Sequence, residues 1–600
     1  MVIRKKENIV LGIYIGTNAS AALFKNNTVI ACVNEERFTK EKNSITYPLN
    51  SVEYCLKAGN VAVEDIDVIA LVGFKYDIQY YLVDHDRFTI NDWIKEQNEF
   101  WYQSIYENKK VNFLEVFKEK IIQSRLDDEI INNLNNPDFR AYIWRQHLIE
   151  KHLGLSVKAK IKMYHHHYSH YYYGLYTGEF YKKDCIIFNM EGFGDVLNAS
   201  AVVWKNGKIN KIMETNICNI GRLYRYITLL LGMKPNEHEY KVMGLAPYCS
   251  EYNIQPVYDI FKQTLNVDGI NFVYKNKPED HYFYFKKKLE GLRFDAIAAG
   301  LQKYTEEIIN KWVSNVIRYT GIGDIVFTGG VGMNIKAMQL LTENSLVKSL
   351  HVGPSVSDDT ISIGVCFKSA LDENFINYKE IENISNVYLG PDIDENLSEK
   401  YIKEKYSNSD QYEIYYNASP EKIAEFLNKG LIIARCSGRM EFGARALGNR
   451  SILAAANNYN MIKKINEKIK SRDFWMPFAP VILDIDAKKY LNLPEKTTTS
   501  NYMSISYNTN KRFREDIIAA LHPADFTARP QVICKKDNPE YYEIIEAYRK
   551  KSGIGALLNT SFNLHGEPIV MDHKDAARVF ELSGLDGLII DKHLIIKKNE

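Results

Sequence analysis

The chain of 600 residues contains a run of histidines whose spacing suits metal binding. His166 and His170 are four positions apart, so on a helix both imidazoles project from one face and can share an ion. His167 and His170, three apart, form a poorer pair, and a polar surface tract is the alternative interpretation. The sequence therefore predicts a metal site that begins with His166 and His170.

Two imidazoles seldom hold an ion alone, so a carboxylate is expected from another part of the chain. Asp358 stands in a turn before a helix that we expect to begin near Ile361. Glu191 stands in a polar loop that follows an expected strand. Both are candidate ligands, and nitrogen with oxygen ligands suits iron, zinc or manganese, so the identity of the ion stays open.

The last third of the chain carries patches that suit an anion. One holds three arginines in a glycine-rich stretch, and arginine forks onto phosphate or carboxylate oxygens. The others combine two cations with hydroxyl and amide donors. The residues are Arg439, Arg445, Arg450, Lys470, Arg472, Ser561 and Asn563. Each patch alone is equally typical of a solvated charged surface, but together they predict a site for a triphosphate and a small acyl group.

Two further stretches could line a ligand cleft. Gly329, Gly330 and Asn334 follow a short apolar run and precede a helical one, where small residues let a phosphate or ribose approach backbone N–H groups. Lys241 lies in a stretch that mixes charge with a glycine turn. Neither stretch is specific by itself.

An internal repeat predicts the scaffold of the first half. Residues 18–27 read NASAALFKNN and residues 198–207 read NASAVVWKNG, with six of ten positions identical. Each copy follows an apolar run and a polar loop, which indicates a strand, a loop and a β-hairpin. A duplicated unit of this kind, followed by helical stretches, is how the actin-like ATPase fold is assembled. We therefore predict a duplicated actin-like α/β domain, with chance similarity of two hairpins as the alternative.

The chain becomes polar after a helical stretch that ends near Leu371. We expect a first domain over residues 1–372 and a second α/β domain over residues 388–600. Within the first domain, residues 84–135 are rich in charge and aromatic side chains and indicate inserted amphipathic helices. A structural role for these helices is favoured over acceptor binding or dimer contact.

The composition excludes several classes of partner. Lys plus Arg number 76 against 75 Asp plus Glu, which gives no electrostatic pull toward a membrane or polymeric nucleic acid. The eight cysteines form no CxxC pair, which favours buried, reduced thiols. Residues 1–8 are charged, and neither a signal peptide nor an apolar run long enough to span a bilayer is visible. A cytoplasmic enzyme is expected.

These motifs, taken in order, resemble one family over nearly the whole chain, the NodU/CmcH carbamoyltransferases. They are residues 35–39 (EERFT), 166–170 (HHYSH), 239–247 (EYKVMGLAP), 329–334 (GGVGMN), 438–443 (GRMEFG), 445–451 (RALGNRS) and 559–563 (NTSFN). The resemblance implies a metal-holding first domain similar to that of tRNA threonylcarbamoyl transferases. It also implies a second, YrdC-like domain, whose KxR…SxN pattern falls on Lys470, Arg472, Ser561 and Asn563.

The resemblance further implies the chemistry. Carbamoyl phosphate and ATP, with Mg²⁺, yield carbamoyl-adenylate in the second domain, and a hydroxyl of a small-molecule acceptor then attacks its carbonyl in the first. His166, His170 and Asp358 would hold a divalent metal, with iron(II) favoured and zinc or manganese as alternatives, that polarises the carbamoyl group. The arginines would neutralise phosphate charge. A homodimer is also implied.

Four residues, at three places in the sequence, depart from the family pattern. Thr17 and Asn18 stand where the family usually has His-Asp, Glu191 stands where it has Asp, and Met476 stands where an arginine is common. The first change leaves open what assists the acceptor hydroxyl. The acceptor itself could be a sugar, an antibiotic or a nucleotide hydroxymethyl group. The competing functions are a tRNA threonylcarbamoyl-type enzyme, which the neutral charge disfavours, and a kinase-like ATPase, which would leave the second domain unexplained.

Overall fold

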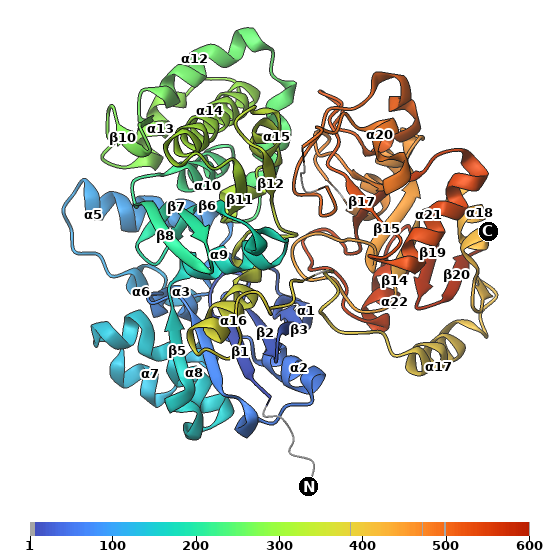
Figure 1. Cartoon of the computed structure of the whole chain (residues 1–600), viewed down its shortest axis with the longest axis horizontal. Coiled ribbons are helices and arrows are strands. Elements are labelled where there is room, and N and C mark those ends of the chain that lie inside the picture. The colour runs from blue at the N-terminus through green and yellow to red at the C-terminus, as the bar shows by residue number, and fades with distance from the viewer. Residues whose placement is uncertain (1–6, 385, 471, 497–499, 599–600) are drawn as a thin grey trace. The chain divides into compact units, whose positions relative to one another are not determined.

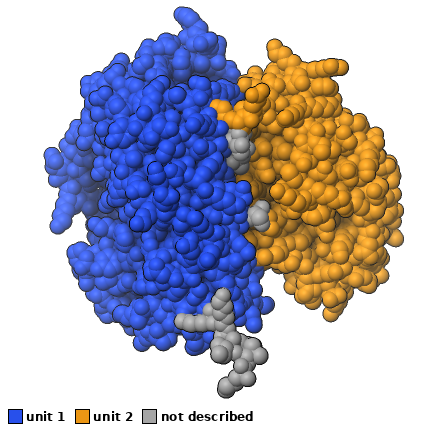
Figure 2. Space-filling model, in the orientation of Figure 1, with its two compact units in different colours: residues 1–36, 42–384 blue, residues 37–41, 385–600 orange. Residues whose placement is uncertain are grey.

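The computed structural model describes residues 7–384, 386–470, 472–496 and 500–598. The chain forms two compact units, shown in different colours in Figure 2. Unit 1 comprises residues 1–36 and 42–384, and unit 2 comprises residues 37–41 and 385–600. Each unit has its own sheets and is described by itself. The expectation that no leader peptide precedes the first strand concerns mainly residues 1–6, which lie outside the described residues.

Unit 1 contains two five-stranded sheets with the same strand order, which confirms the predicted duplication. The first has the order β3-β2-β1-β4-β5, and the second, read from its other edge, has the matching order β8-β7-β6-β11-β12. In each sheet a hairpin of three antiparallel strands is extended by parallel strands. The strands are β1 (Ile9–Tyr14), β2 (Ser20–Lys25), β3 (Thr28–Asn34), β4 (Val68–Val72), β5 (Ile161–Tyr164), β6 (Cys185–Gly194), β7 (Leu197–Lys205), β8 (Lys208–Thr215), β11 (Asp324–Thr328) and β12 (Ser349–His351).

Two helices separate these sheets and lie between them in Figure 1. Helix α16 (Ile361–Asp372) packs on β1, β2 and β4, and helix α9 (His166–Tyr176) packs on β6 and β11. The two helices also pack on each other, and Gly364 makes this possible, because a Cβ atom there would lie 1.8 Å from the Ser169 carbonyl oxygen. This close crossing places the start of α16 beside the start of α9.

The outer helices of unit 1 cover the second sheet and include a small hairpin. Trp312 of α14 packs edge-on against Phe188 of β6, which anchors the longest helix of this layer on the sheet. The elements are α10 (Ile220–Leu230), α11 (Glu239–Leu245), α12 (Glu251–Lys262), β9 (Leu265–Asp268), β10 (Asn271–Tyr274), α13 (His281–Leu289), α14 (Phe294–Thr320) and α15 (Ile335–Glu343). Helix α2 (Leu49–Gly59) packs instead on β2 and β3 of the first sheet.

The segment between β4 and β5 forms short helices, as predicted for residues 84–135. They include α3 (Ile78–Leu82), α4 (Ile90–Lys95), a π-helix (Glu96–Tyr102), α5 (Gln103–Ile105), α6 (Phe113–Val116), α7 (Asp128–Asn133) and α8 (Trp144–Leu153). Trp93 and Phe113 of this segment pack in one apolar cluster with Leu229 of α10 and Tyr282 of α13. The inserted helices therefore pack against α10 and α13 through this cluster.

Unit 2 is built on one mixed sheet of eight strands in the order β13-β20-β19-β14-β15-β18-β16-β17. The strands are β13 (Tyr412–Tyr415), β14 (Ile433–Cys436), β15 (Arg450–Ala455), β16 (Ala479–Leu483), β17 (Gln531–Ile533), β18 (Ala556–Ser561), β19 (Gly587–Ile590) and β20 (His593–Lys597). The main helices are α17 (Glu395–Tyr406), α18 (Pro420–Asn428), α19 (Asn460–Ile465), α20 (Ala487–Tyr490), α21 (Pro539–Ser552) and α22 (His573–Leu582). A π-helix, Asn466–Lys470, continues α19.

No helix within the described residues is long and apolar enough to cross a membrane. The cysteines are all unpaired in the structure, and six of them are buried, as expected; Cys249 and Cys534 are half-buried.

Candidate active site

Helix α9 brings the predicted histidines of unit 1 together. It begins at His166, where the side chain of His165 accepts a hydrogen bond from the backbone N–H of His167 and caps the helix. Because His166 and His170 are one helical turn apart, their Nε2 atoms approach to 3.2 Å. Both imidazoles are buried, so the predicted pair is formed inside the protein and not on its surface.

Both candidate carboxylates reach this pair. Glu191 lies within β6, which runs on through the polar loop expected there. Its Oε2 is 3.0 Å from His166 Nε2 and 3.3 Å from His170 Nε2. Asp358, at the turn before α16, places Oδ1 3.3 Å from His166 Nε2 and 3.4 Å from His170 Nε2. One donor atom from each of the four residues lies within 4.8 Å of the other three. The sequence had left the choice between the two carboxylates open, and the structure supplies both.

The cluster fits a divalent cation. Burial disfavours the protonated form of His166, but the carboxylates of Glu191 and Asp358 raise its pKa well above its usual value. Burial likewise opposes ionisation of Glu191, while His166, His167 and His170 lower its pKa well below its usual value. A buried carboxylate, that of Glu191, and a half-buried one, that of Asp358, packed against imidazoles are costly without a central positive charge. Nitrogen and oxygen donors in this number suit iron, zinc or manganese.

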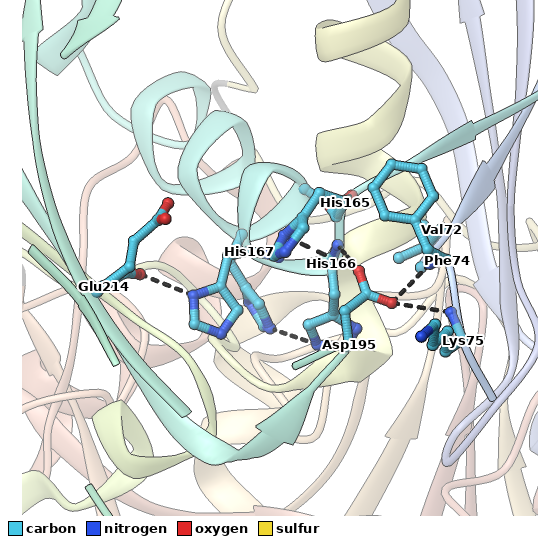
Figure 3. A network of polar contacts seen from close by, with 12 residues as sticks. Val72, Phe74, Lys75, His165, His166, His167, Asp195 and Glu214 are labelled. Carbon is cyan, nitrogen blue, oxygen red and sulfur yellow. Dashed lines mark hydrogen bonds and ion pairs between the residues drawn. The ribbon is translucent and has the colours of Figure 1, made fainter. Parts of the chain in front are cut away.

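Neighbouring polar groups hold the ligands in place, as Figure 3 shows in part. Asp195 accepts from the backbone N–H of His166 at 2.8 Å and also from the N–H groups of Phe74 and Lys75, so it ties the start of α9 to the end of β4. His167, which we considered as a poorer ligand, lies with Nε2 2.6 Å from Glu191 Oε1. It therefore positions Glu191 from the side opposite the cluster.

Tyr14 and Ser200, which the sequence analysis did not single out, contact residues of the cluster or residues beside it. Tyr14 donates to Asp358 Oδ2 at 2.8 Å, and His167 Nδ1 lies 2.7 Å from the hydroxyl of Ser200. Both come from hairpin strands of the repeated unit. Nothing in their local sequence marks them, because their roles depend on strand pairing.

The glycine loop after β11 has a packing role as well as an open face. A Cβ atom at Gly329 would lie 2.4 Å from the Met190 carbonyl oxygen, so the loop needs glycine to approach β6, while Gly330 meets nothing closer than 4.0 Å. Asn334 caps α15 by accepting from Ala337 N–H and also contacts the Tyr224 hydroxyl. Lys241 is buried on α11. The nucleotide contacts expected for these residues stay a prediction.

In unit 2 the predicted lysine converges with the predicted serine and asparagine. Lys470, at the end of the π-helix, donates to the Asn563 carbonyl at 2.9 Å and lies 3.3 Å from the Ser561 hydroxyl. Ser561 donates to Asn563 Oδ1 at 2.8 Å. Arg472 donates to the Thr560 hydroxyl at 3.1 Å. Four residues from two distant stretches therefore meet at the end of β18.

A pocket opens at the same place, and three arginines line it. Arg445 and Arg472 were predicted to bind phosphate, whereas Arg529 was not singled out, because it lies outside the arginine-rich and KxR stretches. The remaining lining includes Ala444, Ala446, Phe478, Ala479, Met503, Asn559, Thr560 and Ser561. Three guanidinium groups beside hydroxyl and amide groups make this an anion-binding pocket by its chemistry.

Arg439 and Arg450 are arranged differently. Arg450 is fully buried, and its guanidinium donates to five backbone carbonyls, those of Met571, Ser437, Gly438, Asn449 and Pro391. Arg439 likewise donates to two carbonyls, those of Leu389 and Gly390. Arg450 therefore serves the fold of unit 2, which corrects the phosphate contact expected from its motif.

The departures from the family pattern also have a structural setting. Thr17, in place of the usual histidine, donates to the carboxylate of Asp86 in the inserted segment, and Asn236 donates to the same side chain at 2.7 Å. Met476 is buried in unit 2. The extra methylene of Glu191 is accommodated, since its carboxylate reaches all three histidines.

Comparison with known proteins places this arrangement in a family. Residues 10–367 match the model described as carbamoyltransferase N-terminus, and residues 424–597 match carbamoyltransferase C-terminus. The chain therefore belongs to the carbamoyltransferase family, of the NodU/CmcH type, and is an enzyme of carbamoyl transfer.

Similar curated proteins include nodulation protein NolNO of Sinorhizobium fredii, 27% identical over 97% of this chain and 79% of that protein. An uncharacterized protein of Methanocaldococcus jannaschii, MJ1051, is 29% identical over 98% of this chain and all of its own length. Nodulation protein NolO of Bradyrhizobium diazoefficiens is 29% identical over 69% of this chain and 76% of its own.

Similar solved structures include two that cover about three fifths of the chain. The ROK hexokinase of Thermus thermophilus, 11% identical, covers 61% of this chain and 99% of its own, with a TM-score of 0.29. Component A of (R)-2-hydroxyglutaryl-CoA dehydratase from Acidaminococcus fermentans, 13% identical, covers 61% and 99% with a TM-score of 0.32. The actin-like assignment of unit 1 rests on the equal strand orders of its two sheets.

Proposed function

We propose that the chain is an ATP-dependent O-carbamoyltransferase that makes carbamoyl-adenylate in unit 2 and transfers the carbamoyl group to a hydroxyl in unit 1. The observation that carries the first half is the meeting of Lys470, Ser561 and Asn563 beside a pocket lined by three arginines. Cations and neutral donors in one place suit a nucleotide triphosphate and a carbamoyl group together.

The proposed reaction in unit 2 has two steps. Carbamoyl phosphate and water give carbamate and phosphate, and a carbamate oxygen then attacks the α-phosphorus of ATP, with pyrophosphate as the leaving group. Arg445, Arg472 and Arg529 would neutralise the phosphate charge, and Mg²⁺ would accompany ATP. Lys470 would orient the carbamoyl group together with Ser561, since it already contacts that hydroxyl.

In unit 1, His166, His170, Glu191 and Asp358 would hold a divalent metal, iron(II) in the first instance, and zinc or manganese as alternatives. When bound, this ion would supply Lewis-acid polarisation of the carbamoyl carbonyl. Tyr14 holds Asp358 and Asp195 holds the backbone of His166, so the ligands are oriented before substrate arrives. The acceptor hydroxyl attacks the carbonyl carbon, the bond to the AMP phosphate oxygen breaks, and AMP leaves.

The substrates of this proposal are small molecules. ATP and carbamoyl phosphate are the donors, and the acceptor is a hydroxyl compound such as a sugar, an antibiotic or a nucleotide with a hydroxymethyl group. The nucleotide contacts of Gly330 and Lys241 in unit 1 are part of the same proposal.

The experiment that tests the proposal is pyrophosphate release from ATP by the full chain, with and without carbamoyl phosphate and without acceptor. We expect release only when carbamoyl phosphate is present, and we expect Lys470→Ala to abolish it. Lys464→Ala is the matched control, because Lys464 is exposed on the adjoining helix and should leave release unchanged. Formation of ADP, or pyrophosphate release that ignores carbamoyl phosphate, would refute the adenylation step.

A further inference from the structure

Helix α10 carries two arginines whose charge is not matched by an ion pair. Arg222 and Arg225 are one turn apart, and within the described residues no carboxylate forms an ion pair with either guanidinium. Arg225 Nε is shielded from solvent and has no hydrogen-bond partner among the described residues. Arg225 also hydrogen-bonds the side chain of Tyr226. The guanidinium of Arg222 and the Nε of Arg225 can therefore donate to a group that the chain does not supply.

Aromatic rings hold both guanidinium groups in place. Arg222 lies 4.6 Å from the centre of the Phe193 ring, and Arg225 lies 5.7 Å and 5.4 Å from the rings of Trp93 and Tyr226. Contacts between a guanidinium and an aromatic ring are favourable and restrict the position of the charged group. The pair is thus preorganised by these ring contacts, and in Arg225 also by the hydrogen bond to Tyr226.

The electrostatics of the pair favour an anion. Burial lowers the pKa of Arg222, and the neighbouring charge of Arg225 lowers it further. Burial opposes the charge of Arg225, but Tyr226 and Glu96 raise its pKa above the usual value, so Arg225 stays charged beside Arg222. Two adjacent, partly desolvated cations repel each other, and a bound oxyanion would relieve that repulsion while accepting their N–H groups.

Arg222 lies beside the part of β6 that carries Glu191. Gly221, which immediately precedes Arg222, is so close to β6 that a Cβ atom would lie 2.7 Å from the Gly192 nitrogen. Phe193, whose ring contacts Arg222, follows two residues after Glu191 and is 49% exposed. A molecule that contacts Arg222 would therefore lie beside the strand that supplies one of the four residues of the cluster.

The pair faces away from the glycine loop. Tyr224, on the same helix, contacts Asn334 at the end of that loop and Gln302 of α14. Arg225, in contrast, faces Trp93 and Glu96 of the inserted segment. Helix α10 thus separates the loop proposed for the nucleotide from the arginine pair, which favours the acceptor as the molecule that the pair binds.

We propose that Arg222 and Arg225 form the acceptor subsite of unit 1 and that they bind a phosphate or carboxylate group of the acceptor. The acceptor would therefore be an anionic hydroxyl compound, held by its charged group while its hydroxyl reaches the metal cluster. This inference rests on the proposed function of unit 1 and narrows its acceptor to one chemical class.

The test measures anion binding by the full chain through the rise in Tm, with inorganic phosphate, acetate and AMP as separate probes and sodium chloride at equal ionic strength as the reference. The measurement uses an Arg445→Ala, Arg472→Ala background, which weakens the anion pocket of unit 2. In this background we compare Arg222→Gln and Arg225→Gln with Arg318→Gln, whose arginine is exposed on α14. Arg222→Lys retains a positive charge and controls for loss of packing against Phe193.

We expect phosphate or acetate to raise Tm and Arg222→Gln to weaken the apparent affinity about tenfold or more, since a charge-assisted hydrogen bond is lost. Arg225→Gln should act in the same direction, Arg222→Lys should lose less, and Arg318→Gln should match the background. A stronger response to phosphate indicates a phosphorylated acceptor, and a stronger response to acetate indicates a carboxylated one.

Three results would overturn the inference. The first is that neither phosphate nor acetate raises Tm more than sodium chloride does. The second is that the Tm of Arg222→Gln responds to the anions as that of Arg318→Gln does. The third is that only AMP gives a rise in Tm that depends on Arg222. The last result would assign the pair to the nucleotide. Pyrophosphate release by the unsubstituted chain reports on unit 2 separately, so failure of the adenylation step is distinguishable from failure of this subsite.

Discussion

Replacement of Arg450 by methionine should destabilise unit 2, and it should do so without acting through a phosphate contact. The guanidinium donates to Met571 O at 2.8 Å and Asn449 O at 2.9 Å, and to three further carbonyls at 3.1–3.3 Å. Methionine keeps most of the apolar stem but leaves these buried carbonyls without a donor. The two short bonds contribute about 1.5 kcal/mol each and the three longer ones about 1 kcal/mol together, so we expect a loss of about 4 kcal/mol.

The assay is thermal unfolding of the full chain, followed by pyrophosphate release at a temperature where the variant is still folded. Arg450→Met should lower the Tm of the transition assigned to unit 2 by several degrees. Arg472→Met is the comparison, because it lines the pocket and should impair pyrophosphate release with a smaller loss of Tm. If Arg450→Met keeps the parental Tm and instead raises the KM for ATP or carbamoyl phosphate, the structural role assigned to Arg450 is wrong.

Further predictions concern unit 1. His351 is buried, and burial lowers its pKa to about 4. The stability that this neutral imidazole allows above pH 6.5 is therefore lost as the pH falls toward 4, at a cost of at most about 3 kcal/mol. Urea unfolding at a series of pH values should show that His351→Gln flattens this part of the dependence of stability on pH. Asp195→Ala removes the acceptor of three backbone N–H groups and should lower stability by about 2 kcal/mol and reduce metal occupancy, whereas unchanged metal content would contradict its positioning role. His170→Ala should lose most of the bound metal measured by mass spectrometry, while His147→Ala, a histidine paired with Asp127 away from the cluster, should retain it.

The elements of unit 1 were predictable because their signals are local. The repeated segments at residues 18–27 and 198–207 each form the hairpin that alternating strands and turn residues indicate. The spacing of His166 and His170 was sufficient for the ligand pair, since helix geometry alone brings residues four apart onto one face. The start of α16 after Asp358 also followed from the polar turn before an apolar run.

The completion of the site was not predictable in the same way. Tyr14 and Asp358 are 344 positions apart, and they meet because helix α16 packs on β1, so closely that a Cβ atom at Gly12 would lie 2.2 Å from the Ser362 carbonyl oxygen. Arg529 joins the pocket of unit 2 from a stretch without a motif, because the pairing of β17 with β16 carries it there.

The arginines show most clearly where sequence information ends. Arg445 and Arg450 belong to one motif, yet Arg445 lines a pocket while Arg450 is enclosed by carbonyls that include those of Pro391 and Met571. The residue types and their spacing determined the family, the reaction class and the close pairing of His166 with His170, because these depend on local patterns. Only the tertiary structure decided which arginines donate to backbone carbonyls and which line the pocket. The physical reason is that a guanidinium donates to whatever acceptors the folded chain brings within about 3 Å.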